Sequence, residues 1–259
     1  STSTDPTPKP AAGGPAAGEP HRKISVGACH LEVMPGEELA WVSGTYEDPN
    51  GGLESKIVQE GETVRVTQKS SLSRFKTAFS GAPRMVLKLG DKNPYRLTLE
   101  GGASNNSFEL GGLPVTGLTV RQGAGKSAFD FSRPNPEEMG LIDIDTGGVS
   151  LSMRNLANAN FTEMRMNGGA SSYEFDFGGE LKRDASVKID VGMASVKITV
   201  PATTAAKISP SSVIGGLNVG DGFTKQEGAF WTKAAVDGET PVLTIAASVT
   251  LGSLSFQLG

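Results

Sequence analysis

Apolar and polar residues alternate along most of this chain in short runs, which is the pattern of half-buried β-strands. Within residues 101–200 the runs follow one recurring phrase: a glycine, one or two small residues, a small polar residue, and renewed alternation. Copies begin roughly 21 to 25 residues apart, at Gly102, Gly123, Gly147, Gly169 and Gly192. A fixed period of this size is typical of a solenoid, in which each repeat buries its apolar face against the next.

Each repeat holds two alternating runs, and the glycine phrase separates them. Glycine permits positive φ and close backbone approach, so we expect the chain to turn a corner there. The first runs are residues 118–121, 142–145, 164–167 and 187–190. The pattern predicts an all-β fold, a single-stranded β-helix or β-solenoid with two short strands in each repeat of roughly 21–25 residues.

Stacked parallel rungs place like side chains in columns, because neighbouring strands lie about 4.8 Å apart. Aligning the second runs gives one inward column of Phe108, Phe129, Leu151, Phe175 and Ile198. The next inward column is Leu110, Phe131, Met153, Phe177 and Val200. The first runs give outward columns of Thr119, Asp143, Arg165 and Lys188, and of Arg121, Asp145, Asn167 and Asp190. We expect Asp143 to meet Arg165 and Arg121 to meet Asp145, since opposite charges stabilise neighbouring strands.

Less regular segments flank these repeats. Residues 24–100 predict an irregular β section with a loop at 70–82, because turn residues separate their short alternating runs. Residues 201–259 predict further rungs that end in a compressed glycine phrase. A solenoid needs its exposed end rung covered, so the aromatic stretch through Phe223, Phe230 and Trp231 is a candidate cap. Residues 21–259 are therefore expected to form one domain.

Residues 1–20 are rich in Ser, Thr, Pro, Ala and Gly, and this composition predicts an extended linker or docking arm. Twenty extended residues reach about 65 Å, far enough to contact a neighbouring subunit. The first residue is Ser1 rather than methionine, so we expect a processed N-terminus, export, and possible tethering there as in a lipoprotein. Candidate partner contacts in this segment are Asp5, Pro8, Pro10, Pro15 and Pro20.

Composition excludes several classes of function. A net charge of -4 and a pI near 5.4 argue against nucleic-acid binding, which needs a clustered basic surface. The chain has no apolar run long enough for a membrane-spanning helix. The single cysteine, Cys29, rules out an internal disulfide.

Few side chains form a pattern with recognisable chemistry. Cys29 and His30 would face opposite sides of a strand, and a zinc set is lacking, so we expect a buried structural cysteine. The run Gly125-Lys126-Ser127 imitates a phosphate loop, but Val120 stands where the first glycine is required. Residues 215–221 match the Gly-Gly-x-Gly-x-Asp pattern of a calcium-binding turn only in part, and the pattern is not repeated. The sequence thus predicts no catalytic residue, no metal and no cofactor.

Two further groups of side chains leave alternatives open. Asp143 and Asp145 share a strand face, as the paired carboxylates of a glycan-cleaving β-helix would. We favour a solvated charge ladder over that catalytic interpretation. Aromatic side chains form either a partner or ligand surface or simple cap packing. They are Trp41, Tyr46, Phe230 and Trp231.

Four segments resemble the toastrack, or putative-adhesin, domain family of bacterial envelope proteins. They are residues 26–33 (VGACHLEV), the repeated Gly-(Gly/Ala)-x-Ser corners, residues 112–118 (GLPVTGL) and residues 251–254 (LGSL). The resemblance spans roughly residues 24–259. It implies a right-handed β-helix-like fold, an envelope or surface location, and roles in adhesion or the envelope-stress response. It implies no catalytic residues.

Three functional hypotheses follow. The favoured one is a non-catalytic, exported bacterial surface protein with a structural or adhesive role. It would self-associate into a filament or tube through its N-terminal arm and its solenoid edges, because unpaired edge strands recruit other chains. The alternative is a monomeric ligand-binding sensor of envelope stress with a site near Trp41 or Trp231. The third is a glycan-active enzyme that uses Asp143 and Asp145.

Overall fold

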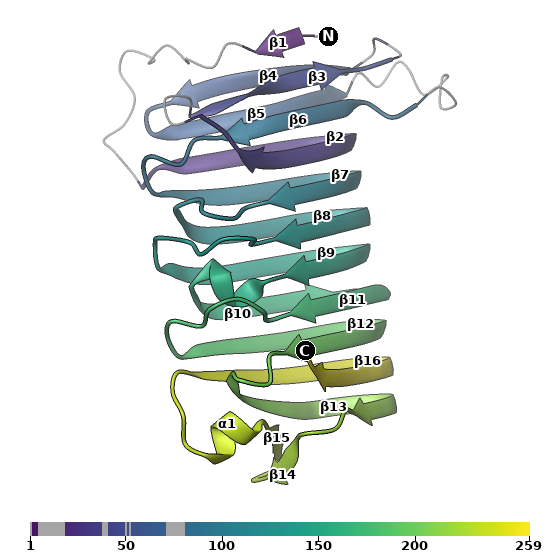
Figure 1. Cartoon of the computed structure of the whole chain (residues 1–259). Helices are drawn as coiled ribbons and strands as arrows, with labels where there is room; N and C mark the ends of the chain where they lie inside the picture. Colours follow the sequence, from purple (N-terminus) through teal and green to yellow (C-terminus); the bar gives the residue numbers. More distant parts are fainter. Residues whose placement is uncertain (1, 5–18, 38–40, 50, 52, 71–80) are drawn as a thin grey trace.

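Long strands, each bent once, stack side by side along a single axis (Figure 1). The computed structural model describes residues 2–4, 19–37, 41–49, 51, 53–70 and 81–259. Within them strands predominate, and helix is confined to the short segments η2 (Leu156–Ala159) and α1 (Lys233–Val236). No helix of this part of the chain is both long and apolar enough to cross a membrane. The expected all-β solenoid is confirmed, and residues 71–80 of the predicted loop lie outside the described residues.

Most rungs are single strands rather than pairs of strands. Seven strands of 15 to 17 residues each run through the bend: β2 (His21–Pro35), β7 (Tyr95–Glu109), β8 (Val115–Asp130), β9 (Met139–Arg154), β12 (Ala185–Val200), β13 (Ala205–Val219) and β16 (Val242–Leu258). One further rung is divided into β10 (Phe161–Gly168) and β11 (Ser171–Asp176). The expectation of two short strands in every repeat is therefore wrong for the undivided rungs, because pairing with the neighbouring rung resumes on both sides of the glycine.

The glycine that leads each phrase lies at the bend, and these glycines stack from rung to rung. Register pairs flank them on both sides, as Gln122 with Thr146 and Ala124 with Gly148 flank Gly123 and Gly147. A Cβ atom on Gly147 would lie 2.4 Å from the carbonyl oxygen of Gly123. Close backbone approach therefore requires glycine here, as the sequence predicted. The complete glycine ladder is Gly27, Gly102, Gly123, Gly147, Gly169 and Gly192.

The inward columns differ from the predicted ones at a single rung. Phe129 on β8 pairs with Met153 on β9, whereas Leu151 pairs with Ser127. The first inward column is therefore Phe108, Phe129, Met153, Phe175, Ile198 and Phe256. Leu151 and Met153 are both buried and two residues apart. A shift of two residues keeps every side chain on its own face, so alternation alone could not reveal the error.

The C-terminal end of the stack departs from sequence order. The strand order ends in β12, β16, β13, β15 (Ala229–Trp231) and β14 (Thr224–Gln226). β16 is parallel to both β12 and β13 and lies between them. The end rung, β13, therefore precedes β16 in the sequence, although β16 occupies the position between β12 and β13 in the stack. β15 runs antiparallel to β13 only at Lys207 and Ile208.

Antiparallel strands surround the other end of the stack. β2 pairs in parallel with β7 on one side, and with β5 (Thr63–Ser70) and β6 (Arg84–Leu89) on the other. β4 (Leu53–Glu60) is antiparallel to β5, and β3 (Val42–Glu47) is antiparallel to β6. β1 (Thr2–Thr4) adds to β3, so the start of the described chain lies at the end opposite β13 (Figure 1).

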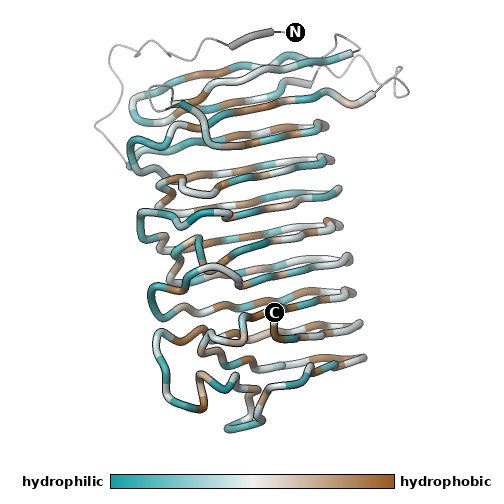
Figure 2. The backbone as a smooth tube through the Cα atoms, viewed as in Figure 1, coloured by the Kyte–Doolittle hydropathy of each residue, from teal (hydrophilic) through white to brown (hydrophobic). Residues whose placement is uncertain are grey.

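One continuous core fills the space between the two layers formed by the halves of each bent strand. Apolar and polar positions alternate along the rungs (Figure 2), and the inward positions are almost fully buried. Most of the buried side chains are aliphatic, and the largest fully buried ones are aromatic, including Tyr95, Tyr173, Phe129, Phe161 and Phe175. The rungs therefore share one hydrophobic core, which lengthens with each added strand.

Candidate functional site

Large apolar side chains that remain exposed gather at the C-terminal end of the stack. Isolated exposed apolar residues are ordinary on protein surfaces, but a cluster of them marks an interaction surface. Among the described residues the large exposed apolar side chains are Met193 (63%), Ile214 (62%), Leu251 (51%), Val236 (44%), Leu217 (42%) and Val219 (36%). All six belong to β12, β16, β13 and the short helix α1.

Three of these side chains continue one outward column beside the glycine ladder. Met193 pairs with Leu251, and Ile214 lies in the irregular step between the pairs Val213–Val249 and Gly215–Gly252. On the earlier rungs the same position is small, as Ala28, Ala103, Ala124, Gly148 and Ala170. The column thus becomes large and apolar only on the last three rungs.

The remaining two strand residues, Leu217 and Val219, are core positions that no further rung of the described chain covers. Leu217 pairs with Leu254 and Val219 with Phe256, and both partners are essentially buried. The backbone of β15 pairs with the other half of β13, and from this cap Phe223 and Phe230 pack against Phe256. The hydrophobic core therefore reaches the surface at residues 211–219. We name this segment the β13 edge.

A shallow groove follows the glycine ladder along the side of the stack. Its volume is about 710 Å³. Four strands, β2, β7, β8 and β9, each contribute the glycine and the two residues before it, and Thr67 and Gln68 of β5 complete the lining. The charged side chains in this groove are Glu100, Arg121 and Asp145.

Most of the charge in the groove is paired within the protein. Glu100 binds Lys23 at 3.1 Å and accepts a hydrogen bond from Ser25 at 3.0 Å. Partial burial opposes ionisation of Glu100, but these contacts outweigh it and lower the pKa of its carboxyl group. Arg121 binds Asp143 at 3.0 Å. Asp145 is exposed on the groove wall, so it is the carboxylate best placed to meet a ligand.

The predicted charge columns have the correct register but different ion pairs. Asp143 is the strand partner of Arg165, and Arg121 that of Asp145. Arg121 nevertheless reaches diagonally to Asp143, while Arg165 binds Glu163 at 2.8 Å. The predicted column neighbours are therefore confirmed, but the ion pairs form elsewhere, because a long arginine side chain can reach a diagonal neighbour as well as the residue opposite. Asp143 is engaged in a charge ladder, and no contact singles it out for catalysis.

Two of the predicted aromatic contacts lie at the N-terminal end and take part in packing. The ring of Trp41 lies 4.7 Å from the guanidinium carbon of Arg22, and Tyr95 lies 5.0 Å from it. Arg22 is only 4% exposed, and burial lowers the pKa of its guanidinium group. Tyr46 is buried and accepts a hydrogen bond from Gln68 at 3.1 Å. The sequence missed Arg22, because an arginine in an alternating strand is expected to face water.

The other two aromatic residues lie at the C-terminal end. Phe230 packs against Phe256 with ring centroids 5.3 Å apart. The ammonium group of Lys207 lies 4.0 Å from the ring of Trp231. The four aromatic candidates therefore form two pairs at opposite ends of the stack rather than one surface.

The N-terminal candidates are mostly beyond what the structure describes. Asp5, Pro8, Pro10 and Pro15 lie outside the described residues. Pro20 lies inside them, and its carbonyl oxygen accepts a hydrogen bond from the backbone of Arg96 at 2.8 Å. This contact fixes the start of β2 beside β7.

The other residues that the sequence suggested for metal or phosphate binding lie in positions that favour a structural role. Cys29 is buried while His30 is exposed, and burial raises the pKa of the thiol to about 11. Among the described residues no three His, Cys, Asp or Glu side chains are grouped so that they could hold a metal ion. Residues 125–127 lie inside strand β8, where a phosphate loop would require a turn into a helix.

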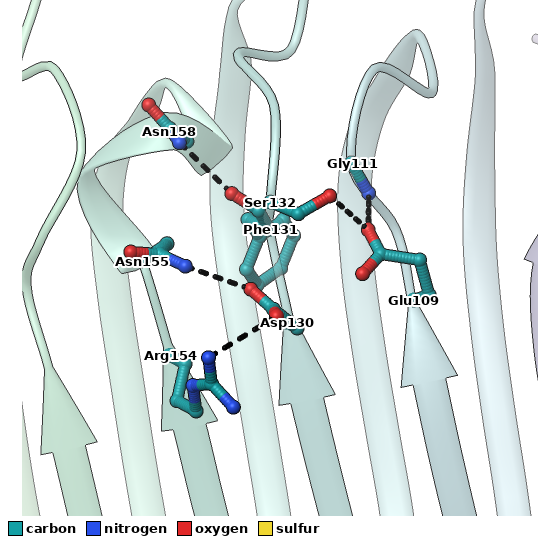
Figure 3. A network of polar contacts seen from close by, with 8 residues as sticks. All are labelled: Glu109, Gly111, Asp130, Phe131, Ser132, Arg154, Asn155 and Asn158. Atoms are coloured by element: carbon teal, nitrogen blue, oxygen red, sulfur yellow. Dashed lines mark hydrogen bonds and ion pairs between the residues drawn. The ribbon is translucent and has the colours of Figure 1, made fainter.

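A polar network ties the loops on the side of the stack away from the glycine ladder (Figure 3). Asn155 donates to Asp130 at 2.8 Å, and Asn158 donates to the carbonyl oxygen of Phe131 at 2.9 Å. Glu109 accepts hydrogen bonds from the backbone of Gly111 and the hydroxyl of Ser132, both at 2.7 Å. These contacts satisfy backbone and side-chain groups of successive rungs, so the network is structural.

Comparisons with known proteins give two findings. Residues 16–148 match the model of a family described as the N-terminal domain of toast_rack (DUF2154). A solved structure titled a "putative cell adhesion protein", from Clostridium sporogenes ATCC 15579, is similar with a TM-score of 0.43 and 12% identity. The alignment covers 93% of this chain and 94% of that one. No curated protein matches the sequence.

Proposed function

The chain belongs to the toast_rack N-terminal-domain family, and from that premise we propose that it is a non-catalytic protein of the bacterial cell surface with a structural or adhesive role. Membership confirms the family resemblance noted in the sequence, by a match over residues 16–148. Such a protein acts through contacts made by its surface rather than through catalytic residues.

The observation that carries the proposal is the uneven distribution of exposed apolar side chains. The glycine ladder and its neighbouring small residues keep large apolar side chains off this side of the stack over the first rungs. At the last three rungs the surface becomes apolar through Met193, Leu251 and Ile214. A rigid stack with one apolar end is suited to association with another macromolecule, because burial of that end removes apolar surface from water.

Self-association is the finer part of the proposal. Strand β1 adds to the edge of β3 within the chain, so a short segment of this sequence can extend the sheet by backbone pairing. The same pairing between chains would give the N-terminal arm a role in assembly. A filament or tube then requires contacts at both ends of the stack.

Location and assembly are tested separately. Labelling of intact host cells with a membrane-impermeant biotin reagent should modify the protein, whereas a cytosolic marker in the same cells stays unmodified. An unlabelled protein would contradict the surface location.

Electron microscopy of native material should show filaments or tubes, and deletion of residues 1–20 should abolish them while leaving a folded chain. Polymers that survive the deletion would exclude a role for the arm.

A second function, the ligand-binding sensor, is favoured by the groove along the glycine ladder. The groove does not include Trp41 or Trp231, so the site expected near those residues moves to Arg121 and Asp145. Thermal shift assays with peptides, glycan fragments and lipid vesicles test this function. A ligand that raises the melting temperature of the wild type but not of Asp145→Asn would support it, and the absence of any shift would exclude these ligand classes.

A further inference from the structure

We infer that the β13 edge is the contact surface for a second copy of this chain, which adds its own β13 edge antiparallel across a two-fold axis. The inference deepens the proposed function, on which it rests, by naming the segment and the symmetry of one assembly contact. Its first support is the backbone edge of the end rung. β13 pairs along its length with β16, and among the residues that the structure describes only β15 pairs with its other side, at Lys207 and Ile208.

Backbone donors on this edge point away from the protein. Gly220 donates its N–H group to the carbonyl oxygen of Phe256 at 2.8 Å. N–H groups alternate in direction along a strand, so that of Val219 points away from β16 and so does that of Leu217. A strand laid along the edge would accept these hydrogen bonds, as in other cases of strand addition.

The side chains of the edge need a cover as well. Leu217 and Val219 continue the buried columns of Val196–Leu254 and Ile198–Phe256, yet they are 42% and 36% exposed. A second β13 edge would present the same two side chains to them. The open ends of the two cores would then cover each other, and apolar surface would leave water on both copies.

Charge and strand length indicate why the occupant is the same segment of another copy. Residues 211–219 carry no charged side chain, although natural proteins commonly protect edge strands with charges. At the opposite end of the stack, the layer that continues residues 211–219 ends in β6, β3 and the three-residue β1, which pairs with β3. A head-to-tail neighbour would meet this short strand, and very short edge strands are poor templates for pairing with another chain. Two neutral β13 edges present equal lengths to each other, and their pairing makes a closed two-fold contact.

The test measures self-association of the full chain by sedimentation velocity over about 1–100 μM, the range of weak specific complexes. The wild type should form a species of twice the 26.9 kDa chain mass. Val219→Pro removes the outward N–H group without removing a bond inside the chain, and should weaken association at least about tenfold. Val219→Thr keeps that N–H group and the branched shape, so it should associate within about threefold of the wild type.

A matched pair of charge variants tests the side-chain contribution. Leu217→Lys places a charge on the β13 edge and should also weaken association at least about tenfold. Val236 on α1 has nearly the same exposure, 44% against 42%, but lies on the cap, so Val236→Lys should associate like the wild type. Hydrogen exchange on the wild type requires no variant: amides of residues 211–219 should exchange more slowly as protein concentration rises.

Three outcomes would overturn the inference. They are a wild type that stays monomeric at every concentration, association that is unchanged in both Val219→Pro and Leu217→Lys, and amides of residues 211–219 whose exchange does not slow as protein concentration rises. If assembly persists in both variants, the contact is wrong while the proposed surface role stands. If the β13 variants are monomeric but the protein is absent from the cell surface, the contact stands and the proposed function fails.

Discussion

Gly123 and Gly147 lie so close across β8 and β9 that the carbonyl oxygen of the first fills the space a side chain on the second would need. The distance from that oxygen to a Cβ atom built on Gly147 is 2.4 Å. The neighbouring Gly148 has no such restriction, since its nearest atom would lie 3.7 Å away. Two adjacent glycines therefore have different roles, and only the first is required by the bend.

Gly147→Ala should lower the free energy of unfolding by about 1–3 kcal/mol, because the added methyl group forces two backbones apart. Gly148→Ala is the matched control and should change the free energy of unfolding by less than about 1 kcal/mol. This change can be a stabilisation, because alanine lowers the conformational entropy of the unfolded chain. Urea unfolding followed by circular dichroism measures both. Equal losses in the two variants would contradict the assigned role of the ladder.

Arg22→Lys should destabilise the protein by about 1–3 kcal/mol. The guanidinium group lies over the rings of Trp41 and Tyr95 and donates to the backbone carbonyl oxygens of His21 and Glu62, both at 3.3 Å. A lysine ammonium group lacks the planar fork that makes these ring contacts and hydrogen bonds together. Lys23→Arg, on the exposed side of the same strand, should stay within about 0.5 kcal/mol of the wild type. Denaturant midpoints compare the two, and a neutral Arg22→Lys would show that the stack contributes little.

Asn158→Ala should cost about 1–3 kcal/mol, because it leaves buried backbone groups without partners. The side-chain amide donates to the carbonyl oxygen of Phe131 at 2.9 Å, and its oxygen accepts from the backbone of Glu180 at 3.0 Å. Asn167 is exposed, so Asn167→Ala should be nearly neutral. Thermal unfolding measures both variants, and an equal fall in their melting temperatures would contradict the role assigned to the Asn158 side chain.

Cys29 should make stability depend on alkaline pH. Burial raises the pKa of its thiol from 9.0 to about 11. The folded state therefore holds the proton more tightly, so the contribution is complete below about pH 9 and is lost as pH rises toward 11. Two pKa units set an upper limit of about 2.7 kcal/mol.

The difference between wild type and Cys29→Ala isolates this contribution, because burial also raises the pKa values of Tyr46, Tyr95 and Tyr173, which therefore add to the loss of stability at alkaline pH. Urea unfolding from pH 8 to 11 should show a smaller loss for the variant. Parallel pH profiles for the two proteins would rule out the thiol as a contributor.

Local sequence signals predicted several parts of the structure because their causes are local. Glycine is the residue that can occupy a bend where backbones touch, so the phrase at Gly147 identified the corner without any tertiary information. Strict alternation placed Asp143 and Arg165 in register on one outward column. The same alternation could not distinguish Leu151 from Met153, since both face inward and differ by one full period.

The candidate surface was less predictable. Met193, Leu251 and Ile214 look unremarkable one at a time, and they form a column only because β16 lies between β12 and β13. Sequence order would have placed β16 at the end and buried β13 beneath it. The sequence predicted aromatic contact residues instead, and two of them, Trp41 and Phe230, are packed against neighbours in the structure.

The sequence by itself determined the class of fold, the glycine corners and the composition of the core, because backbone geometry and apolar alternation act over a few residues. Only the tertiary structure decided the order of the last rungs, the diagonal ion pair between Arg121 and Asp143, and the exposure of Leu217 and Val219. Those features depend on which strand pairs with which, and pairing between distant segments is settled by burial summed over the whole stack rather than by any local pattern.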